Sequence, residues 1–306
     1  MIKVFGHKAP DTDSTGSPII WAWYLSEVRK TPAKAVLQGE PNTEAGWMLA
    51  KWGIDKPEII SDVAAGDQCV VVDTNNPAEL PASLGEADVI EIIDHHLLAG
   101  GIKTRLPINI TIRPLACTAT IMHDLIGNDD LARAPRAVKG AMLTCILSDT
   151  LEFRSPTTTP HDRFVAEKLA KDLGVSIPDY AAEMFAAKSD VSSFSDEALL
   201  RMDSKEYELA GRQLRVSVLE TTAPQVLLDR KDALMAAMPA VAAADGAEEV
   251  LLFIVDILNE EATLLVPNDF VRQVAEKSFG ANVAGDTVVL PGIMSRKKQI
   301  IPALAV

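Results

Sequence analysis

The sequence predicts an α/β protein with two domains: an N-terminal doubly wound parallel sheet and a smaller C-terminal mixed α/β domain. The chain has 306 residues, whereas a single domain typically has ~150. Two segments, 68–73 and 88–94, are almost continuously apolar, as expected for strands buried on both faces of a parallel sheet. Strand patterns also alternate with helical patterns through the first half, which is typical of a doubly wound sheet.

The first domain is expected to span residues 1–187. Short β-branched runs predict strands at residues 2–6, 34–38, 68–73 and 88–94. Helical periodicity predicts helices at residues 19–30, 43–52, 118–126, 137–147, 160–173 and 177–187. Thr159 and Pro160 support one of these helix starts, because threonine caps helices and proline is favoured at the first helical position.

A change of composition separates the two halves. Residues 188–195 are polar and serine-rich, which predicts a flexible linker. The second domain is then expected to span residues 196–306. Its predicted elements are strands at 213–219, 249–257, 262–266, 287–290 and 298–304, with helices at 224–238 and 268–279.

The chain carries 43 acidic and 29 basic side chains, a formal net charge of −14. An acidic surface repels polyphosphate backbones, so we expect no nucleic-acid partner, although a local basic pocket can still bind a small anion. No apolar run approaches the ~18 residues that span a bilayer, and the first residues do not resemble a signal peptide, so no membrane partner is expected. Three scattered cysteines indicate a reduced, cytoplasmic protein.

Polar residues follow three of the predicted strands of the first domain. They are His7, Asp11 and Asp13 after the first strand, Asp73 after the third, and Asp94, His95 and His96 after the fourth. Ligands bind at the carboxyl ends of such strands, and neighbouring strand ends lie close together. Each segment alone fits a turn or a helix cap. Together, their imidazoles and carboxylates indicate a transition-metal site.

With these motifs the sequence resembles the DHH phosphoesterase superfamily and, within it, the family II (manganese-dependent) inorganic pyrophosphatases. The resemblance begins with residues 6–14 and the Asp-His-His run at 94–96. It continues through residues 117–120, 148–150 with 155–157, 203–206 and 295–298, and so covers essentially the whole chain. It implies an N-terminal catalytic domain, a C-terminal substrate-binding domain of the DHHA2 type, an active site in the cleft between them, and a homodimer.

The same resemblance implies two Mn²⁺ ions in each active site, with Co²⁺ or Mg²⁺ as substitutes. The ligands of the first ion would be His7, Asp11 and Asp73. The ligands of the second would be Asp13, Asp73, His95 and Asp149. Asp73 would therefore bridge the two ions, and Asp94 is expected to orient a histidine.

Pyrophosphate carrying an additional Mg²⁺ is the implied substrate. Residues 295–298 include three consecutive cations, and arginine and lysine both bind phosphate. The expected substrate contacts are His96, Lys205, Arg296 and Lys297. Lys298 fits a solvated sheet edge equally well. A hydroxide that bridges the metals is expected to attack one phosphorus, with Asp73 and His96 as catalytic residues and His96 as a proton donor to the leaving phosphate.

One residue departs from the family pattern. Relatives commonly carry Asp-His-Asn where this chain has Asp73, Thr74 and Asn75. The replacement of an imidazole by Thr74 bears on the surroundings of the metals and on metal preference. It leaves the predicted ligand set unchanged.

Two other enzymatic functions remain open alternatives. An exopolyphosphatase would use the same metal site on a longer chain of phosphoanhydrides. Other DHH-family phosphoesterases cleave short oligonucleotides or cyclic dinucleotides, but they typically carry a histidine-containing C-terminal motif, and this chain has no histidine after His161. A regulatory, nucleotide-binding protein would need an insertion in the first domain, for which residues 110–150 leave no room.

Several residues outside these motifs are expected to have structural roles. His123 and His161 have no clustered ligand types beside them. The cysteines are expected to be small buried hydrophobic residues, with Cys117 at a helix start that would depress its pKa. The aromatic residues at 21–24 are expected in the core or in a subunit interface.

Overall fold

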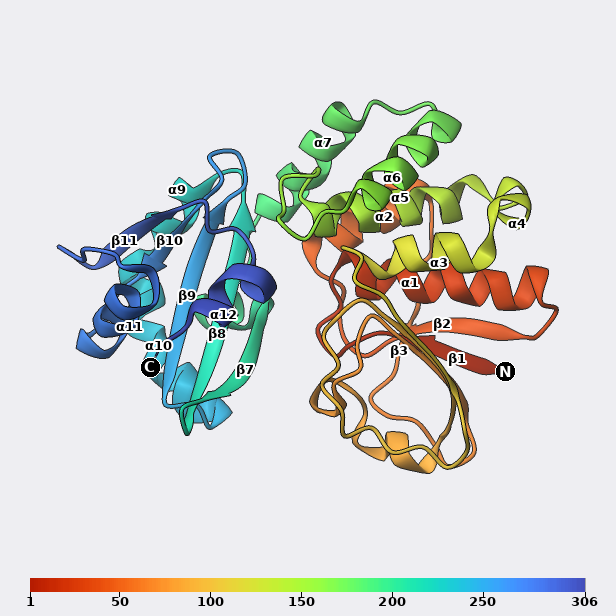
Figure 1. The fold of residues 1–306 in the computed structure, drawn as a ribbon, viewed down its shortest axis with the longest axis horizontal. Helices are drawn as coiled ribbons and strands as arrows, with labels where there is room; N and C mark the ends of the chain where they lie inside the picture. Colours follow the sequence, from red (N-terminus) through yellow and green to blue (C-terminus); the bar gives the residue numbers. More distant parts are fainter. Residues whose placement is uncertain (306) are drawn as a thin grey trace. The chain divides into compact units, whose positions relative to one another are not determined.

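A computed structural model describes residues 1–305 and divides the chain into two compact units, Met1–Ala187 and Lys188–Val306. Each unit has its own sheet, six-stranded in the first and five-stranded in the second (Figure 1). This is the α/β fold class that the sequence predicts. Among the described residues, no helix is long and apolar enough to cross a membrane.

The sheet of the first unit is parallel throughout. Its strands are β1 (Ile2–Phe5), β2 (Ala33–Leu37), β3 (Glu58–Ile59), β4 (Gln68–Val72), β5 (Asp88–Asp94) and β6 (Asn109–Ile112). They are arranged in the order β3-β2-β1-β4-β5-β6, which is the order of a doubly wound fold. The direction of winding reverses between β1 and β4, and ligand sites form beyond the carboxyl ends of strands at such a reversal.

The helices of the first unit lie on one side of this sheet (Figure 1). They are α1 (Thr12–Trp23), α2 (Thr43–Trp52), α3 (Thr118–Ile126), α4 (Asn128–Ala132), α5 (Arg136–Thr150), α6 (Pro160–Leu173) and α7 (Ile177–Ser189). α1 contacts β1 and β2 as well as α3 and α5. A second core, including Phe5, Val71 and Leu80, lies between the sheet and the 3-10 turns Pro77–Glu79 and Ala82–Glu86.

The main correction in the first unit concerns the first helix. α1 starts at Thr12 rather than at residue 19, because the Asp11 carboxylate caps it by accepting a hydrogen bond from the Ser14 N–H at 2.9 Å. Its last turn differs too, since Tyr24–Val28 form a π-helical turn. The short strands β3 and β6 are additional to those predicted. The early start places Asp13 in the first turn of a helix rather than in a loop.

The second unit contains a mixed sheet. Its strands are β7 (Ser204–Leu209), β8 (Arg212–Thr221), β9 (Glu249–Asp256), β10 (Glu261–Leu265) and β11 (Thr287–Pro291), in the order β11-β10-β9-β8-β7. β8 and β9 are parallel, and the other neighbours are antiparallel. The helices are α8 (Asp196–Met202), α9 (Pro224–Leu228), α10 (Lys231–Asp245), α11 (Asp269–Phe279) and α12 (Ile301–Ala303).

Two predictions for the second unit are wrong. The expected strand at 298–304 is a π-helical turn, Arg296–Ile300, followed by α12, because the Ser295 side chain caps the turn by accepting from the Lys298 N–H at 3.2 Å. The helix expected at 224–238 is two helices, α9 and α10. β7 and α8 are additional elements. Within the predicted linker, α7 continues to Ser189, and Val191 is buried in the core of the second unit.

Candidate metal centre and active site

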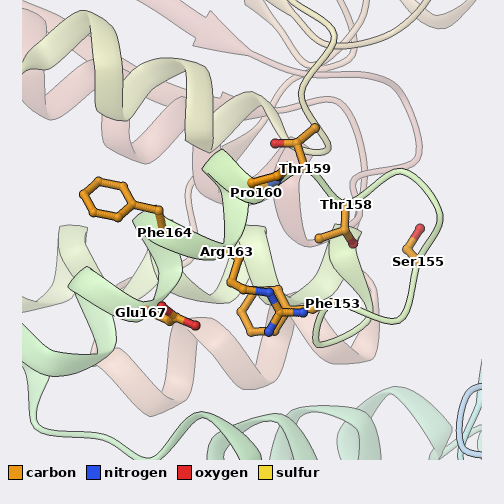
Figure 2. Close-up of a pocket in the computed structure, with 8 residues that line it drawn as sticks. All are labelled: Phe153, Ser155, Thr158, Thr159, Pro160, Arg163, Phe164 and Glu167. Carbon is orange, nitrogen blue, oxygen red and sulfur yellow. The ribbon is translucent and has the colours of Figure 1, made fainter.

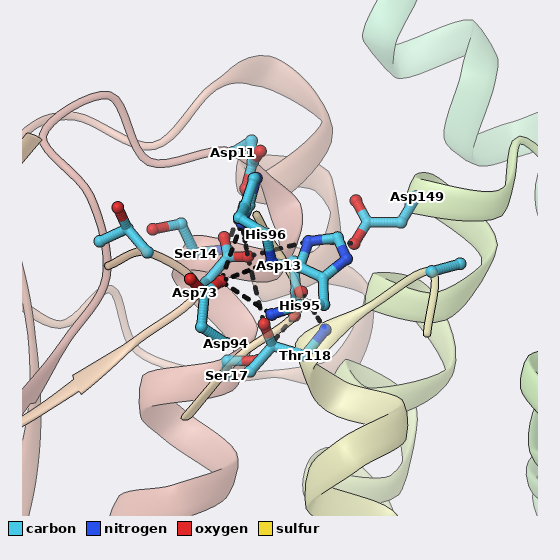
Figure 3. Close-up of polar contacts among 12 residues, drawn as sticks. Asp11, Asp13, Ser14, Ser17, Asp73, Asp94, His95, His96, Thr118 and Asp149 are labelled. Atoms are coloured by element: carbon cyan, nitrogen blue, oxygen red, sulfur yellow. Dashed lines mark hydrogen bonds and ion pairs between the residues drawn. The ribbon is translucent and has the colours of Figure 1, made fainter. Parts of the chain in front are cut away.

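Seven of the predicted site residues converge at the carboxyl edge of the first sheet, beside the reversal between β1 and β4, and Figure 3 labels all of them except His7. They come from the β1–α1 segment (His7, Asp11, Asp13), the end of β4 (Asp73), and the end of β5 (Asp94, His95, His96). Asp149, in the last turn of α5, joins the same cluster. The expectation that these strand ends meet is therefore confirmed.

Three overlapping groups of side chains have ligand atoms that all lie within 4.8 Å of one another. The groups are His7 with Asp11 and Asp73, Asp13 with His95 and Asp149, and Asp73 with His95 and His96. The first group is the ligand set expected for one metal ion. The second, with Asp73 added, is the set expected for the other. The arrangement thus offers two adjoining nitrogen and oxygen donor sets.

Asp73 lies between the two donor sets. Its Oδ2 is 3.5 Å from His7 Nε2, and its Oδ1 is 3.4 Å from His95 Nε2. The backbone at Asp73 is left-handed, with φ of 58°, and its N–H donates to the Ile93 carbonyl at 2.9 Å. A left-handed conformation is uncommon outside glycine, although aspartate and asparagine tolerate it better than most residues. This backbone turn directs a buried carboxylate toward both histidines.

Hydrogen bonds fix the carboxylate of Asp13. Its Oδ1 accepts from the Ser17 hydroxyl at 2.6 Å, and its Oδ2 accepts from the Thr118 N–H at the start of α3 at 2.7 Å. The Thr118 hydroxyl also donates to Asp73 Oδ1 at 3.2 Å. Thr118 therefore connects the two carboxylates from a third segment of the chain. Sequence reasoning did not assign a role to Thr118, although it lies in one of the quoted motifs.

The tautomer of His95 follows from its contacts. Its Nδ1 lies 3.2 Å from the Leu115 carbonyl, which can only accept, so Nδ1 carries the hydrogen. In the neutral ring the lone pair is then on Nε2. That atom faces Asp73 and lies 3.9 Å from Asp149 Oδ2. A neutral Nε2 directed at carboxylates is the arrangement of a metal-ligating histidine.

The charges of the cluster are poorly compensated by the protein itself. Burial, followed by repulsion from Asp13 and Asp11, raises the pKa of Asp73 well above its ordinary value. Burial and the same two neighbours also raise the pKa of Asp149. Among the described residues, the Oδ2 atoms of Asp73 and Asp149 are buried and accept no hydrogen bond. Divalent cations would satisfy these atoms and remove the repulsion, so the residues fit the predicted metals.

Asp94 is fully buried and orients His96. Its Oδ1 lies 2.9 Å from His96 Nδ1, and it also accepts from the backbone N–H groups of His95 and His96. Although burial opposes ionisation, the His96 hydrogen bond and the charges of both histidines lower the pKa of Asp94 below its ordinary value. Asn75 Nδ2 donates to Asp94 Oδ2, and Asn75 Oδ1 accepts from Ala99 N–H at 2.7 Å. Asn75 is a contributor that sequence reasoning did not identify.

Thr74, the departure from the family pattern, is also buried. Its hydroxyl donates to Glu79 Oε2 at 2.7 Å and accepts from the Asn76 N–H at 3.2 Å. Thr74 therefore stabilises the turn that follows Asp73.

The predicted substrate-binding cations lie in the second unit. Arg296 opens the π-helical turn, and its guanidinium contacts Asp203, with Nη2 at 2.7 Å from Oδ1 and Nη1 at 2.9 Å from the backbone oxygen. Burial lowers the pKa of Arg296, but Asp203 and other acidic neighbours raise it overall. Lys205 lies on β7, two residues after Asp203. Lys297 is the residue after Arg296 in the π-helical turn. The structure thus brings the Arg296 side chain to the segment that carries Lys205.

A pocket of about 410 Å³ lies elsewhere on the first unit, along α6 and the segment before it (Figure 2). Its lining residues are Phe153, Ser155, Thr158, Thr159, Pro160, Arg163, Phe164 and Glu167. The Arg163 guanidinium lies 4.2 Å from the centre of the Phe153 ring. None of the predicted metal ligands lines this pocket.

The remaining titratable residues have structural contacts. His161 Nε2 lies 2.8 Å from Asp124 Oδ1, and His123 is buried beside the same carboxylate. All three cysteines are buried, as predicted. The expectation of a depressed pKa at Cys117 is wrong, because burial and the nearby Asp13 and Asp149 raise it well above its ordinary value.

Comparison with known protein families supports the sequence resemblance. Residues 1–148 match the DHH family N-terminal domain, and residues 182–305 match the DHHA2 domain. A protein of Deinococcus radiodurans is 40% identical over 99% of this chain and 98% of its own length. Its counterpart in Lactobacillus acidophilus is 35% identical over 98% of this chain and 96% of its own length. Both relatives are named as manganese-dependent inorganic pyrophosphatases.

The fold agrees with a solved structure. A crystal structure from Methanococcus jannaschii, assigned to the family II inorganic pyrophosphatases, superimposes with a TM-score of 0.86 and 32% identity. The match covers 99% of this chain and 98% of the solved one. Full-length identity of this size, together with both domain matches, shows that the chain belongs to the family of manganese-dependent (family II) inorganic pyrophosphatases, within the DHH family.

Proposed function

We propose that this protein hydrolyses inorganic pyrophosphate to two phosphates with two Mn²⁺ ions in its active site. The observation that carries the proposal is the pair of adjoining donor sets that meet at Asp73. Many enzymes that hydrolyse or transfer phosphoryl groups use two neighbouring metal ions, and a carboxylate shared between two donor sets fits such a site.

His7, Asp11 and Asp73 would hold one ion, and Asp13, Asp73, His95 and Asp149 would hold the other. Bound Mn²⁺, or Co²⁺ or Mg²⁺ as substitutes, would lower the pKa of a shared water and supply hydroxide near neutral pH. The chain contributes the geometry, because Asp13 is fixed by Ser17 and Thr118, and His95 by the Leu115 carbonyl.

The substrate would carry a further Mg²⁺. Arg296 and Lys297 would neutralise charge on the phosphate oxygens, with Lys205 as a third cation. His96 would bind the leaving phosphate and donate a proton to it. Its Nδ1 is hydrogen-bonded to Asp94, which stabilises the protonated ring and leaves Nε2 as the donating atom. We further propose that the enzyme acts as a homodimer in the cytoplasm.

The test is phosphate release by metal-stripped protein, with and without added Mn²⁺, from pyrophosphate, tripolyphosphate and long-chain polyphosphate. We expect Mn²⁺-dependent release from pyrophosphate, with much slower release from the longer chains. A preference for long polyphosphate would instead support the alternative exopolyphosphatase function, which the same donor sets could serve. Absence of phosphate release with Mn²⁺ and Mg²⁺ both present would refute the proposal.

A further inference from the structure

Glu44 is a buried carboxylate outside the predicted ligand set. It lies in the first turn of α2 and is 1% exposed. Its Oε1 accepts a hydrogen bond from the Thr12 hydroxyl at 2.6 Å and another from the Ser148 hydroxyl. Both hydroxyl residues are themselves buried. One oxygen atom of α2 therefore joins the start of α1 to the end of α5.

The two hydroxyl residues adjoin the metal ligands. Thr12 lies between Asp11 and Asp13, and Ser148 immediately precedes Asp149. Thr12 is separated from Glu44 by 32 residues and Ser148 by 104, so the contact connects distant parts of the chain. Through Thr12 and Ser148, Glu44 links the backbone that carries Asp13 to the backbone that carries Asp149. These are the two carboxylates that share a donor set with His95.

The chemical nature of Glu44 is informative, because burying a carboxylate is costly unless hydrogen bonds compensate it. The hydroxyl groups of Thr12 and Ser148 could be packed together without a carboxylate between them. A carboxylate can receive both hydroxyl hydrogens on one oxygen, as Glu44 Oε1 does here. Residues that do not bind the metal but hold its ligands in place contribute to metal affinity.

We propose that Glu44 is a positioning residue that sets the spacing between Asp13 and Asp149 and thereby the affinity of their donor set for Mn²⁺. The inference rests on the proposed two-metal function. It predicts that replacing Glu44 weakens Mn²⁺ binding by the folded protein, in addition to any loss of stability. A purely structural residue would lower the unfolding temperature and leave the affinity of the folded protein for Mn²⁺ unchanged.

The experiment compares Glu44→Ala, Glu44→Gln and a matched control, Thr144→Val. Thr144 is also buried, lies on α5, and forms a hydroxyl contact of 2.6 Å with Tyr180 that does not involve a metal-ligand neighbour. Each metal-stripped protein is titrated with Mn²⁺, and the concentration of free Mn²⁺ is measured by electron paramagnetic resonance to obtain the dissociation constants. Unfolding temperatures and pyrophosphatase activity are measured on the same samples.

We expect Glu44→Ala to weaken binding at one Mn²⁺ site about 10-fold, the lower end of the range for groups that hydrogen-bond a metal ligand directly, because Glu44 acts through Thr12 and Ser148. Glu44→Gln retains an accepting oxygen and should recover a large part of that loss. Thr144→Val should lower the unfolding temperature while its Mn²⁺ affinity stays at the wild-type value. Wild-type affinity in Glu44→Ala, or an equal loss in Thr144→Val, would overturn the proposal.

Two controls keep the outcomes separate. If Glu44→Ala does not fold, Ser148→Ala decides the question, because it removes one of the two hydrogen bonds and should weaken the same Mn²⁺ site; unchanged affinity in Ser148→Ala would then overturn the proposal. The wild-type protein is assayed in parallel. A wild-type protein inactive on pyrophosphate would refute the proposed function, whereas an active wild type beside a Glu44→Ala variant with unchanged affinity would refute only the role of Glu44.

Discussion

Asp73 in the first unit and Arg296 in the second are both charged residues expected to act on the same substrate, yet the protein holds them differently. Asp73 is 1% exposed, and its backbone conformation, its burial and its histidine neighbours all direct the carboxylate. The Arg296 side chain is 15% exposed and is held chiefly by Asp203. Asp73 is thus oriented by its backbone and its burial, whereas Arg296 is held by a charged partner that a phosphate could replace.

The largest expected effect follows replacement of Asp73. Loss of the shared carboxylate should reduce Mn²⁺-dependent pyrophosphate hydrolysis by on the order of 10³-fold or more, since single charge-stabilising groups already contribute 10²–10³. Asp73→Ala would also strain the left-handed backbone at this position. Asp73→Asn is the better variant, because asparagine tolerates that conformation. Both variants should lose Mn²⁺ when metal content is measured, and undiminished activity in either would exclude a bridging role.

A smaller and different effect is expected for Arg296→Ala. Removal of a guanidinium that is proposed to bind phosphate should lower kcat/KM by about 10²-fold. The Mn²⁺ content should stay at the wild-type value, because Arg296 lies in the other unit from the ligands. Lys298→Ala is the matched control, since Lys298 is an exposed cation in the same turn. Loss of metal or of folding in Arg296→Ala would contradict the proposal that the first unit binds the metals and Arg296 binds the substrate.

The same contrast explains which parts of the site could be predicted from the sequence. Asp94 ends an apolar strand and His95 and His96 follow it directly, so their place at the sheet edge followed from the pattern. The helix that begins at Thr12 was expected later because its first turn is polar and shows no apolar periodicity before Ile19. Its start depends on a side-chain cap by Asp11, which competes with the turn conformations that the same residues favour.

Contacts between distant segments could not be predicted. Thr118 is 105 residues from Asp13, and Ser148 is 104 residues from Glu44, so no local pattern indicates either hydrogen bond. Residues 298–304 were expected to form a strand, but the Ser295 hydroxyl accepts from the Lys298 N–H and caps a helical turn there instead. Local pattern therefore located the strand ends that carry the predicted ligands, while tertiary hydrogen bonds orient Asp13, Asp73 and His95.

The smallest expected effect concerns pH and the metal-free protein. Burial and carboxylate repulsion raise the pKa of Asp73 and Asp149 in the folded state. A carboxyl group with a raised folded-state pKa binds more protons when folded, so its stabilisation is present at low pH and is lost as the pH rises from the unfolded value through the folded value. The contribution of Asp73 and Asp149 to the stability of the metal-free first unit should therefore fall as the pH rises above about 4.

Cations replace those protons, so the gain in Tm caused by saturating Mn²⁺ should be larger at pH 8 than at pH 5. Each kcal/mol of the difference corresponds to about 2–4 °C for a unit of this size. Scanning calorimetry of metal-free and Mn²⁺-saturated protein at both pH values measures the effect. Asp149→Asn supplies the control, because an amide does not titrate and should reduce the pH dependence. Arg296→Ala should leave the pH dependence unchanged, since its source is charge repulsion among the buried carboxylates of the first unit. An equal gain in Tm at both pH values in the wild type would contradict this origin.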